Sequence, residues 1–280
     1  MRDILLQIDT YPEATPAQAI DQAVRFTAAL DGVLSALAVE VDIRAPRNRL
    51  ADHLIGLTQL AEEEERKSRR ACAASLEVFS TVAGKAGVLG DAFHGKAGLY
   101  GVGKYVAERA RTRDLCIIPV VDRLDGQRAV VEAVVFGSGR PVLTFRPGIA
   151  DLSGDGPGSI VLAWDGTRTA ARAMADALPV LRRAREVRVL TVTNEKPSAH
   201  SGQGKDAVRH LEAHGVNALV DEVDAGGRRI GQVLEAYLAQ HRSDLLVMGA
   251  YGRSRAREFI LGGATEHMLH DHKTPLLLSH

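Results

Sequence analysis

The segment SIVLAWDG, residues 159–166, is an apolar run that ends beside an aspartate, and the chain contains a similar segment earlier. The earlier copy is DILLQIDT, residues 3–10, with its aspartate in the equivalent place. Two further pairs of similar segments follow in the same order: RDLCIIPV (113–120) with SDLLVMGA (243–250), and RPVLTF (140–145) with TPLLLS (274–279). Self-similarity of this kind indicates one structural unit that is written twice.

Each copy alternates short apolar runs with segments whose apolar residues recur at helical spacing. In the second copy the predicted strands are 159–164, 186–193, 217–223, 244–250 and 274–279. Alternating strands and helices with apolar strands predict an α/β fold, in which a parallel sheet is covered by helices on both faces. The segment RPGIADLSGDGPGS is rich in glycine, proline and aspartate, which is typical of a linker. We therefore expect domains at residues 1–146 and 159–280, joined by a linker at 147–158.

The first copy has an additional helical segment, NRLADHLIGLTQLAEEEERKSRRACAASLEVFSTVAG. Its expected i,i+4 ion pairs are Glu62–Arg66, Glu63–Lys67 and Glu65–Arg69. One interpretation is a long helix with a solvated charged face. The other is an arm that binds a partner or forms a dimer.

Composition limits the functional classes. The 280 residues include 35 basic and 35 acidic side chains, so the formal net charge of zero gives no indication of a nucleic-acid or membrane partner. No apolar run approaches the roughly 18 residues that suggest a membrane span. Cys72 and Cys116 lie outside any metal-ligand spacing, and Cys116 lies in an apolar run, which favours buried reduced thiols. The sequence predicts a cytoplasmic protein.

Ligands of open parallel sheets bind beyond the carboxyl ends of the strands, where the winding direction reverses. If the strands that end near Asp165 and Gly249 are neighbours, a carboxylate and a glycine-rich loop meet there. Backbone N–H groups at glycines approach an anion closely, and a helix that begins near Gly263 adds its N-terminal dipole. The carboxylate suits ribose hydroxyls or base N–H groups.

The loop GAYGRSRAREFILGG, residues 249–263, reads G-x2-G-x9-G-G. It resembles the G-x2-G-x9-G-[S/T] loop of the universal stress protein family, and Asp165, SDLLVMGAYGRS, ATEHML and TPLLLS agree with that resemblance. The second half resembles the family strongly and the first half weakly. The resemblance implies two tandem five-stranded, Rossmann-like parallel-sheet domains with strand order 3-2-1-4-5.

The resemblance also implies that the second domain binds an adenine nucleotide, ATP, with or without Mg²⁺. Asp165 would contact the adenosine and Val192 the adenine, and Arg253 is placed to reach a phosphate. Gly263 stands where the family has Ser or Thr, a lost hydroxyl for which Thr265 is a candidate replacement. The implied nucleotide-binding residues are Asp165, Val192, Gly249, Gly252, Arg253, Gly262, Gly263 and Thr265.

The first copy lacks this loop. Pro119 replaces the first glycine, and Asp122, at the second, would repel phosphate. Only FGSGRP, residues 136–141, resembles the end of the motif. We expect no ATP site in this half, and we interpret Asp9 as a remnant or a cap.

Other motifs are weaker. GLYGVGKY, residues 98–105, has Tyr105 where a P-loop needs Ser or Thr, and no strand leads into it. His210 and His214 lack the glutamate of H-E-x-x-H, and the histidines of EHMLHDH have a simpler role at a helix C-terminus.

The sequence therefore predicts a nucleotide-binding regulatory protein of the stress response. No general base is aimed at a γ-phosphate, so at most weak ATPase activity is expected. From the resemblance and the apolar last strand we expect a homodimer, with a further protein partner unidentified; packing of the two halves would satisfy that edge within one chain instead. The alternatives are a scaffold that binds no nucleotide, or a small-ligand carrier that uses the glycine-rich segment 95–104.

Overall fold

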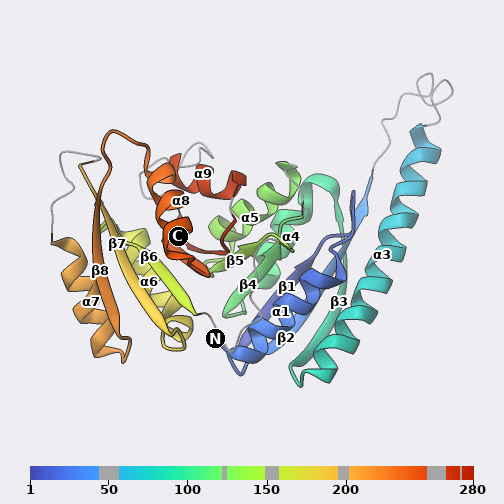
Figure 1. Cartoon of the computed structure of the whole chain (residues 1–280). Coiled ribbons are helices and arrows are strands. Elements are labelled where there is room, and N and C mark those ends of the chain that lie inside the picture. The colour runs from blue at the N-terminus through green and yellow to red at the C-terminus, as the bar shows by residue number, and fades with distance from the viewer. Residues whose placement is uncertain (44–56, 122–124, 149–157, 195–201, 251–262, 272) are drawn as a thin grey trace.

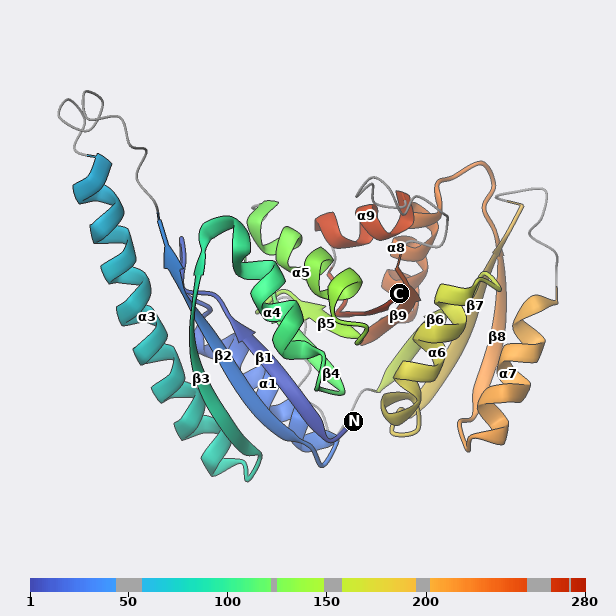
Figure 2. The same cartoon turned by 180° about the vertical axis from the view of Figure 1, so that it is seen from behind.

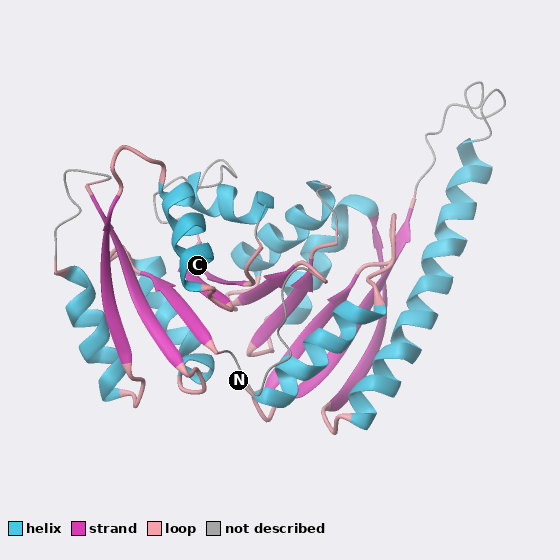
Figure 3. Ribbon diagram, viewed as in Figure 1, coloured by secondary structure: helices cyan, strands magenta, loops and turns pink. Residues whose placement is uncertain are grey.

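The computed structural model describes residues 1–43, 57–121, 125–148, 158–194, 202–250, 263–271 and 273–280. In these residues, ten strands form one twisted sheet in the order β3-β2-β1-β4-β5-β10-β9-β6-β7-β8 (Figure 3). Each half contributes five strands in the order 3-2-1-4-5, which confirms the predicted fold class.

The strands and helices of the first half alternate as predicted. Its strands are β1 (Asp3–Ile8), β2 (Val33–Asp42), β3 (Leu89–Gly98), β4 (Leu115–Pro119) and β5 (Val142–Phe145). Its helices are α1 (Ala17–Ala29), α3 (Leu57–Lys85), the 3-10 turn η1 (Leu99–Gly101), α4 (Val102–Ala110) and α5 (Asp125–Gly137).

The second half repeats this course. Its strands are β6 (Ser159–Ala163), β7 (Glu186–Thr193), β8 (Ala218–Asp224), β9 (Leu245–Gly249) and β10 (Leu276–Ser279). Its helices are α6 (Arg168–Leu181), α7 (Gln203–Ala213), α8 (Ile230–His241) and α9 (Gly263–Asp271). The expected linker falls between β5 and β6, and residues 149–157 of it lie outside the described residues.

Helices cover both faces of the sheet, because the strands are apolar on both sides. Helices α1, α3, α6 and α7 pack on one face, and α4, α5, α8 and α9 on the other. Figures 1 and 2 show α3 beside β3 at one end of the molecule and α7 beside β8 at the other. Each core cluster contains residues of both halves, so the two units share a hydrophobic layer on each face of the sheet.

The two halves meet where β10 pairs with β5, antiparallel, with Leu277 opposite Leu143. All other described strand pairs are parallel. The apolar last strand is therefore not an exposed edge, since its backbone bonds to the first half of the same chain. This removes the edge strand as an argument for a homodimer, and the dimer remains a prediction.

The long insertion forms α3, a helix of 29 residues, which confirms the predicted helix. All three of its expected i,i+4 pairs are wrong in the described part of the chain, where Arg66 has no ion pair. Lys67 pairs with Glu64 at 2.6 Å, and Arg69 pairs with Glu40 of β2 at 3.0 Å. Arg69 lies on the side of α3 that faces the sheet, where the buried carboxylate of Glu40 binds it in place of Glu65.

Candidate functional site

The carboxyl ends of β6 and β9 lie side by side in the second half. The two strands pair in parallel, with Leu162 opposite Val247. Asp165 follows the end of β6, and Gly249 is the last residue of β9. The structure thus brings together two of the residues that the sequence predicts for the nucleotide site.

Asp165 is exposed to solvent and is held by a turn. One carboxylate oxygen, Oδ1, accepts hydrogen bonds from the backbone N–H and the hydroxyl of Thr167, at 3.1 and 2.6 Å. Thr167 is also the N-cap of α6, where its Oγ1 accepts from the N–H of Ala170 at 3.2 Å. Within the described part of the chain the other oxygen, Oδ2, has no hydrogen bond, so it is available to a ligand.

Gly249 is required by packing. A Cβ atom there would lie 2.5 Å from the carbonyl carbon of Thr169 and 2.6 Å from the backbone nitrogen of Ala170. These are backbone atoms at the start of α6, so they cannot move aside as a flexible side chain can. The first glycine of the motif therefore lets β9 approach α6, a role that its loop context did not reveal.

The other predicted site residues divide into three groups. Gly263 is the exposed first residue of α9, and a Cβ added there would meet open space. Val192 is half-buried near the end of β7, whereas Thr265 is buried, with 3% of its surface exposed. Gly252, Arg253 and Gly262 lie outside the described residues.

Two polar side chains that sequence reasoning missed lie at the same edge. Trp164 directly follows β6 and precedes Asp165, and Thr191 lies on the adjacent strand β7. The backbone N–H of Trp164 donates to the carbonyl of Leu190 on β7. The buried atoms Trp164 Nε1 and Thr191 Oγ1 have no hydrogen-bond partner among the described residues. Buried polar groups are normally satisfied, so these two atoms indicate a polar contact that the described chain does not supply.

The first half closes the equivalent position. Asp9 is buried, and its two oxygens accept from Gln7 Nε2 at 2.6 Å and Gln127 Nε2 at 2.7 Å. Gln127 Oε1 accepts from the backbone N–H of Val121 at 2.8 Å, which ties α5 to the end of β4. Burial raises the pKa of Asp9 above its ordinary value, and the two amide hydrogen bonds only oppose that shift.

Gln127 reaches the strand ends because the connection is short. β4 ends at Pro119 and α5 begins at Asp125, whereas β9 ends at Gly249 and α9 begins at Gly263. Without the intervening loop, the first turn of α5 lies over β1 and β4. Asp122, which the sequence places in this connection, lies outside the described residues.

The glycine-rich segment 95–104 has structural roles. A Cβ at Gly95 would lie 2.5 Å from the ring of Tyr105, and one at Gly103 would lie 2.7 Å from Cβ of Ala133. These glycines let β3 approach α4 and let α4 approach α5. The spacing that resembles a P-loop is thus explained by packing.

The remaining candidates from the sequence also have ordinary partners. Both cysteines are buried and free, and burial raises the pKa of Cys72 to about 11 and of Cys116 to about 12, as expected of inert thiols. His210 contacts the ring of His214, and His267 bonds to Glu235 at 3.1 Å. In the described ranges, no helix is long and apolar enough to cross a membrane.

Comparison with known proteins agrees with this geometry. Residues 158–280 match the model of the universal stress protein family. This match is confined to the second half of the chain. No curated protein matches the sequence.

Solved structures extend the comparison to the whole chain. A universal stress protein from Archaeoglobus fulgidus DSM 4304 has a TM-score of 0.69 and 14% identity, covering 98% of this chain and 95% of that chain. A putative universal stress protein from Pseudomonas aeruginosa UCBPP-PA14 has a TM-score of 0.56 and 16% identity, covering 100% of this chain and 93% of that chain. At this identity the similarity concerns the fold, and it covers both halves. The chain therefore has a tandem universal stress protein fold.

Proposed function

We propose that the second domain binds an adenine nucleotide, ATP, at the carboxyl ends of β6 and β9, and that the protein serves a regulatory role in the stress response. The observation that carries this proposal is the open strand end: Asp165 is exposed, with Oδ2 free of hydrogen bonds in the described part of the chain. A carboxylate in that state is a suitable acceptor for ribose hydroxyls.

The surroundings of Asp165 support a nucleotide over a simple anion. Among the described residues, Trp164 Nε1 and Thr191 Oγ1 have no hydrogen-bond partner, and both groups suit the edge of a base. Gly263, which begins α9, supplies a helix N-terminus for phosphate. Nucleotide bound across these elements would stabilise the folded protein by mass action.

The missing hydroxyl at Gly263 weakens the proposed site. One hydrogen bond to a charged group contributes about 1.5–3 kcal/mol, or roughly tenfold to a hundredfold in affinity. Thr265 is buried and has an interaction of its own, so we expect little compensation from it. We therefore propose a modest affinity for ATP and no efficient hydrolysis.

Isothermal titration calorimetry with ATP and AMP tests this function. We expect saturable binding of ATP by the wild type, and its loss in Gly252→Glu, which adds a carboxylate to the phosphate loop. Absence of binding at millimolar nucleotide would favour the alternative, a scaffold that binds no nucleotide. Binding that survives Gly252→Glu would move the site elsewhere.

We also propose that the protein is cytoplasmic and forms a homodimer through a surface other than β10, which β5 already covers. Light scattering checks the second point, and a monomer mass would refute it.

A further inference from the structure

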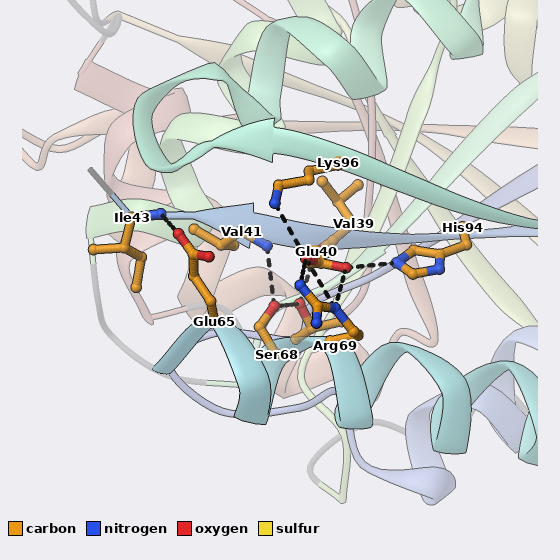
Figure 4. A network of polar contacts seen from close by, with 10 residues as sticks. Val39, Glu40, Val41, Ile43, Glu65, Ser68, Arg69, His94 and Lys96 are labelled. Carbon is orange, nitrogen blue, oxygen red and sulfur yellow. Dashed lines mark hydrogen bonds and ion pairs between the residues drawn. The ribbon is translucent and has the colours of Figure 1, made fainter. Parts of the chain in front are cut away.

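Glu40 of β2 is a buried carboxylate that contacts Arg69, His94 and Lys96 (Figure 4). Arg69 of α3 binds both of its oxygens, with Nη2 3.0 Å from Oε1 and Nε 3.2 Å from Oε2. On β3, His94 Nε2 lies 3.2 Å from Oε2, and Lys96 Nζ lies 3.4 Å from Oε1. Residues from two elements thus converge on one negative charge.

The cluster has more positive charge than Glu40 needs. Arg69 and Lys96 carry two positive charges against the single charge of Glu40. Glu65, which accepts from the N–H of Ile43, is a second carboxylate near Arg69, and His94 adds positive charge when it is protonated. The hydrogen bond from Arg69 is the main reason that the pKa of Glu40 is lowered, and the carboxylate stays ionised at neutral pH.

The side chain of Glu40 is buried, whereas the side chains that contact it are exposed. The side chain of Glu40 is 5% exposed, whereas those of Arg69, His94 and Lys96 are 57%, 47% and 50% exposed. Solvent therefore meets the cations and not the carboxylate. A ligand that approaches this surface meets a positive potential.

The frame that holds the cations is rigid on both sides. On α3, Ser68 is buried and accepts from the N–H of Val41 at 3.0 Å, and Glu65 accepts from the N–H of Ile43 at 2.8 Å (Figure 4). On β3, Gly95 lies between His94 and Lys96 and packs against the ring of Tyr105. Arg69, His94 and Lys96 are therefore positioned before any ligand arrives, which lowers the entropic cost of binding.

Arg66 extends the positive surface by one turn of α3. It is exposed and has no ion pair in the described part of the chain. Glu62, one further turn along, limits the surface on that side.

We propose that Arg69, His94 and Lys96 form an anion-binding site in the first domain, and that its ligand is a small molecule that carries phosphoryl groups. Each cation keeps donors that Glu40 does not use: Nη1 of Arg69, two N–H groups of Lys96, and the second ring nitrogen of His94 when protonated. Donors from three directions match a tetrahedral dianion better than a single planar carboxylate. The site does not depend on nucleotide binding in the second domain.

Nuclear magnetic resonance of the full-length protein tests this site with inorganic pyrophosphate as the probe. The imidazole C–H resonance of His94, assigned with His94→Gln, reports on this position alone, so binding in the second domain does not interfere. We expect saturable changes in this resonance at low ionic strength. Chloride at equal ionic strength should not reproduce these changes.

Three variants locate the site. Lys96→Ala should weaken the affinity for pyrophosphate by about fivefold, as expected for an exposed charge. Arg66→Ala leaves the contacts of Glu40 intact and should weaken this affinity by about twofold. The matched control Lys67→Ala removes one exposed charge that pairs with Glu64 and should leave the affinity unchanged. No saturable shift of His94 by about 10 mM pyrophosphate, where a weak millimolar site would be filled, would overturn the proposal. Equal weakening by Lys67→Ala and Lys96→Ala would overturn it too, because binding would then follow net charge alone.

Discussion

The ends of β1 and β6 carry the same aspartate in opposite states. Asp9 is buried, with both oxygens bound to glutamine amides, whereas Asp165 is exposed, with one oxygen held by Thr167. The strands and their order are the same in the two halves. The difference arises in the connection after the fourth strand, which in the first half places Gln127 over the strand ends. A change in one connection thus leaves the sheet and core of the repeated fold intact and covers one of its two strand ends.

The largest expected effect concerns Gly249, on which the packing of β9 against α6 depends. Gly249→Ala places a methyl group against the backbone of Thr169 and Ala170, so we expect a loss of about 3 kcal/mol in the free energy of unfolding, typical of an overpacked site. Urea denaturation measures this loss. Gly263→Ala is the matched control, because its Cβ meets open space and its stability should not fall. Equal losses in the two variants would contradict the packing role of Gly249.

A smaller effect is expected at the position where the family motif has a hydroxyl. Gly263→Ser adds that hydroxyl at an exposed site with room for it, so we expect ATP to bind about tenfold more tightly. Calorimetric titration of the variant against wild type and Gly263→Ala separates the hydroxyl from the effect of the Cβ atom. An unchanged affinity in Gly263→Ser would mean that phosphate does not lie at the start of α9.

The smallest effect concerns the closed site. Because burial raises the pKa of Asp9, the folded state holds its proton more tightly than the unfolded state, and ionisation destabilises the fold as the pH rises above about 4. Asp9→Asn removes this cost and should be more stable than wild type at neutral pH, by on the order of 1 kcal/mol.

Thermal unfolding of Asp9→Asn and wild type across pH 3 to 7 checks this prediction. The advantage of the variant should grow from the acidic end of the range to the neutral end. Asp165→Asn is the comparison at the exposed strand end of the second half. If the stability of wild type instead rose relative to that of Asp9→Asn as the pH rises, Asp9 would have an unrecognised cationic partner.

The sequence was sufficient to predict the fold because its signals are local and repeated. The apolar runs that end near Asp9 and Asp165 define the first strand of each half, and the order of the later segments defines the rest. The pairing of β5 with β10 could be stated only as one of two options, since an apolar strand does not show which strand will cover it.

The site was less predictable, because its decisive contacts join residues far apart in the chain. Gln127 lies 118 residues from Asp9, and its helix resembles any other. The sequence shows that the first half lacks the loop. It does not show which side chain occupies the space over the strand ends. In the same way, the partner of Arg69 is Glu40 on a different element, and helical spacing alone favoured Glu65.

Nucleotide titration of the paired variants Asp165→Asn and Asp9→Asn tests the central claim most directly. Trp164, the only tryptophan of the chain, lies beside Asp165, so its fluorescence should report ATP binding at the open site. We predict a saturable change in wild type and Asp9→Asn with the same affinity, and binding weakened by about tenfold in Asp165→Asn through loss of the anionic acceptor. Equal weakening in both variants, or a loss only in Asp9→Asn, would contradict the assignment of one open and one closed site.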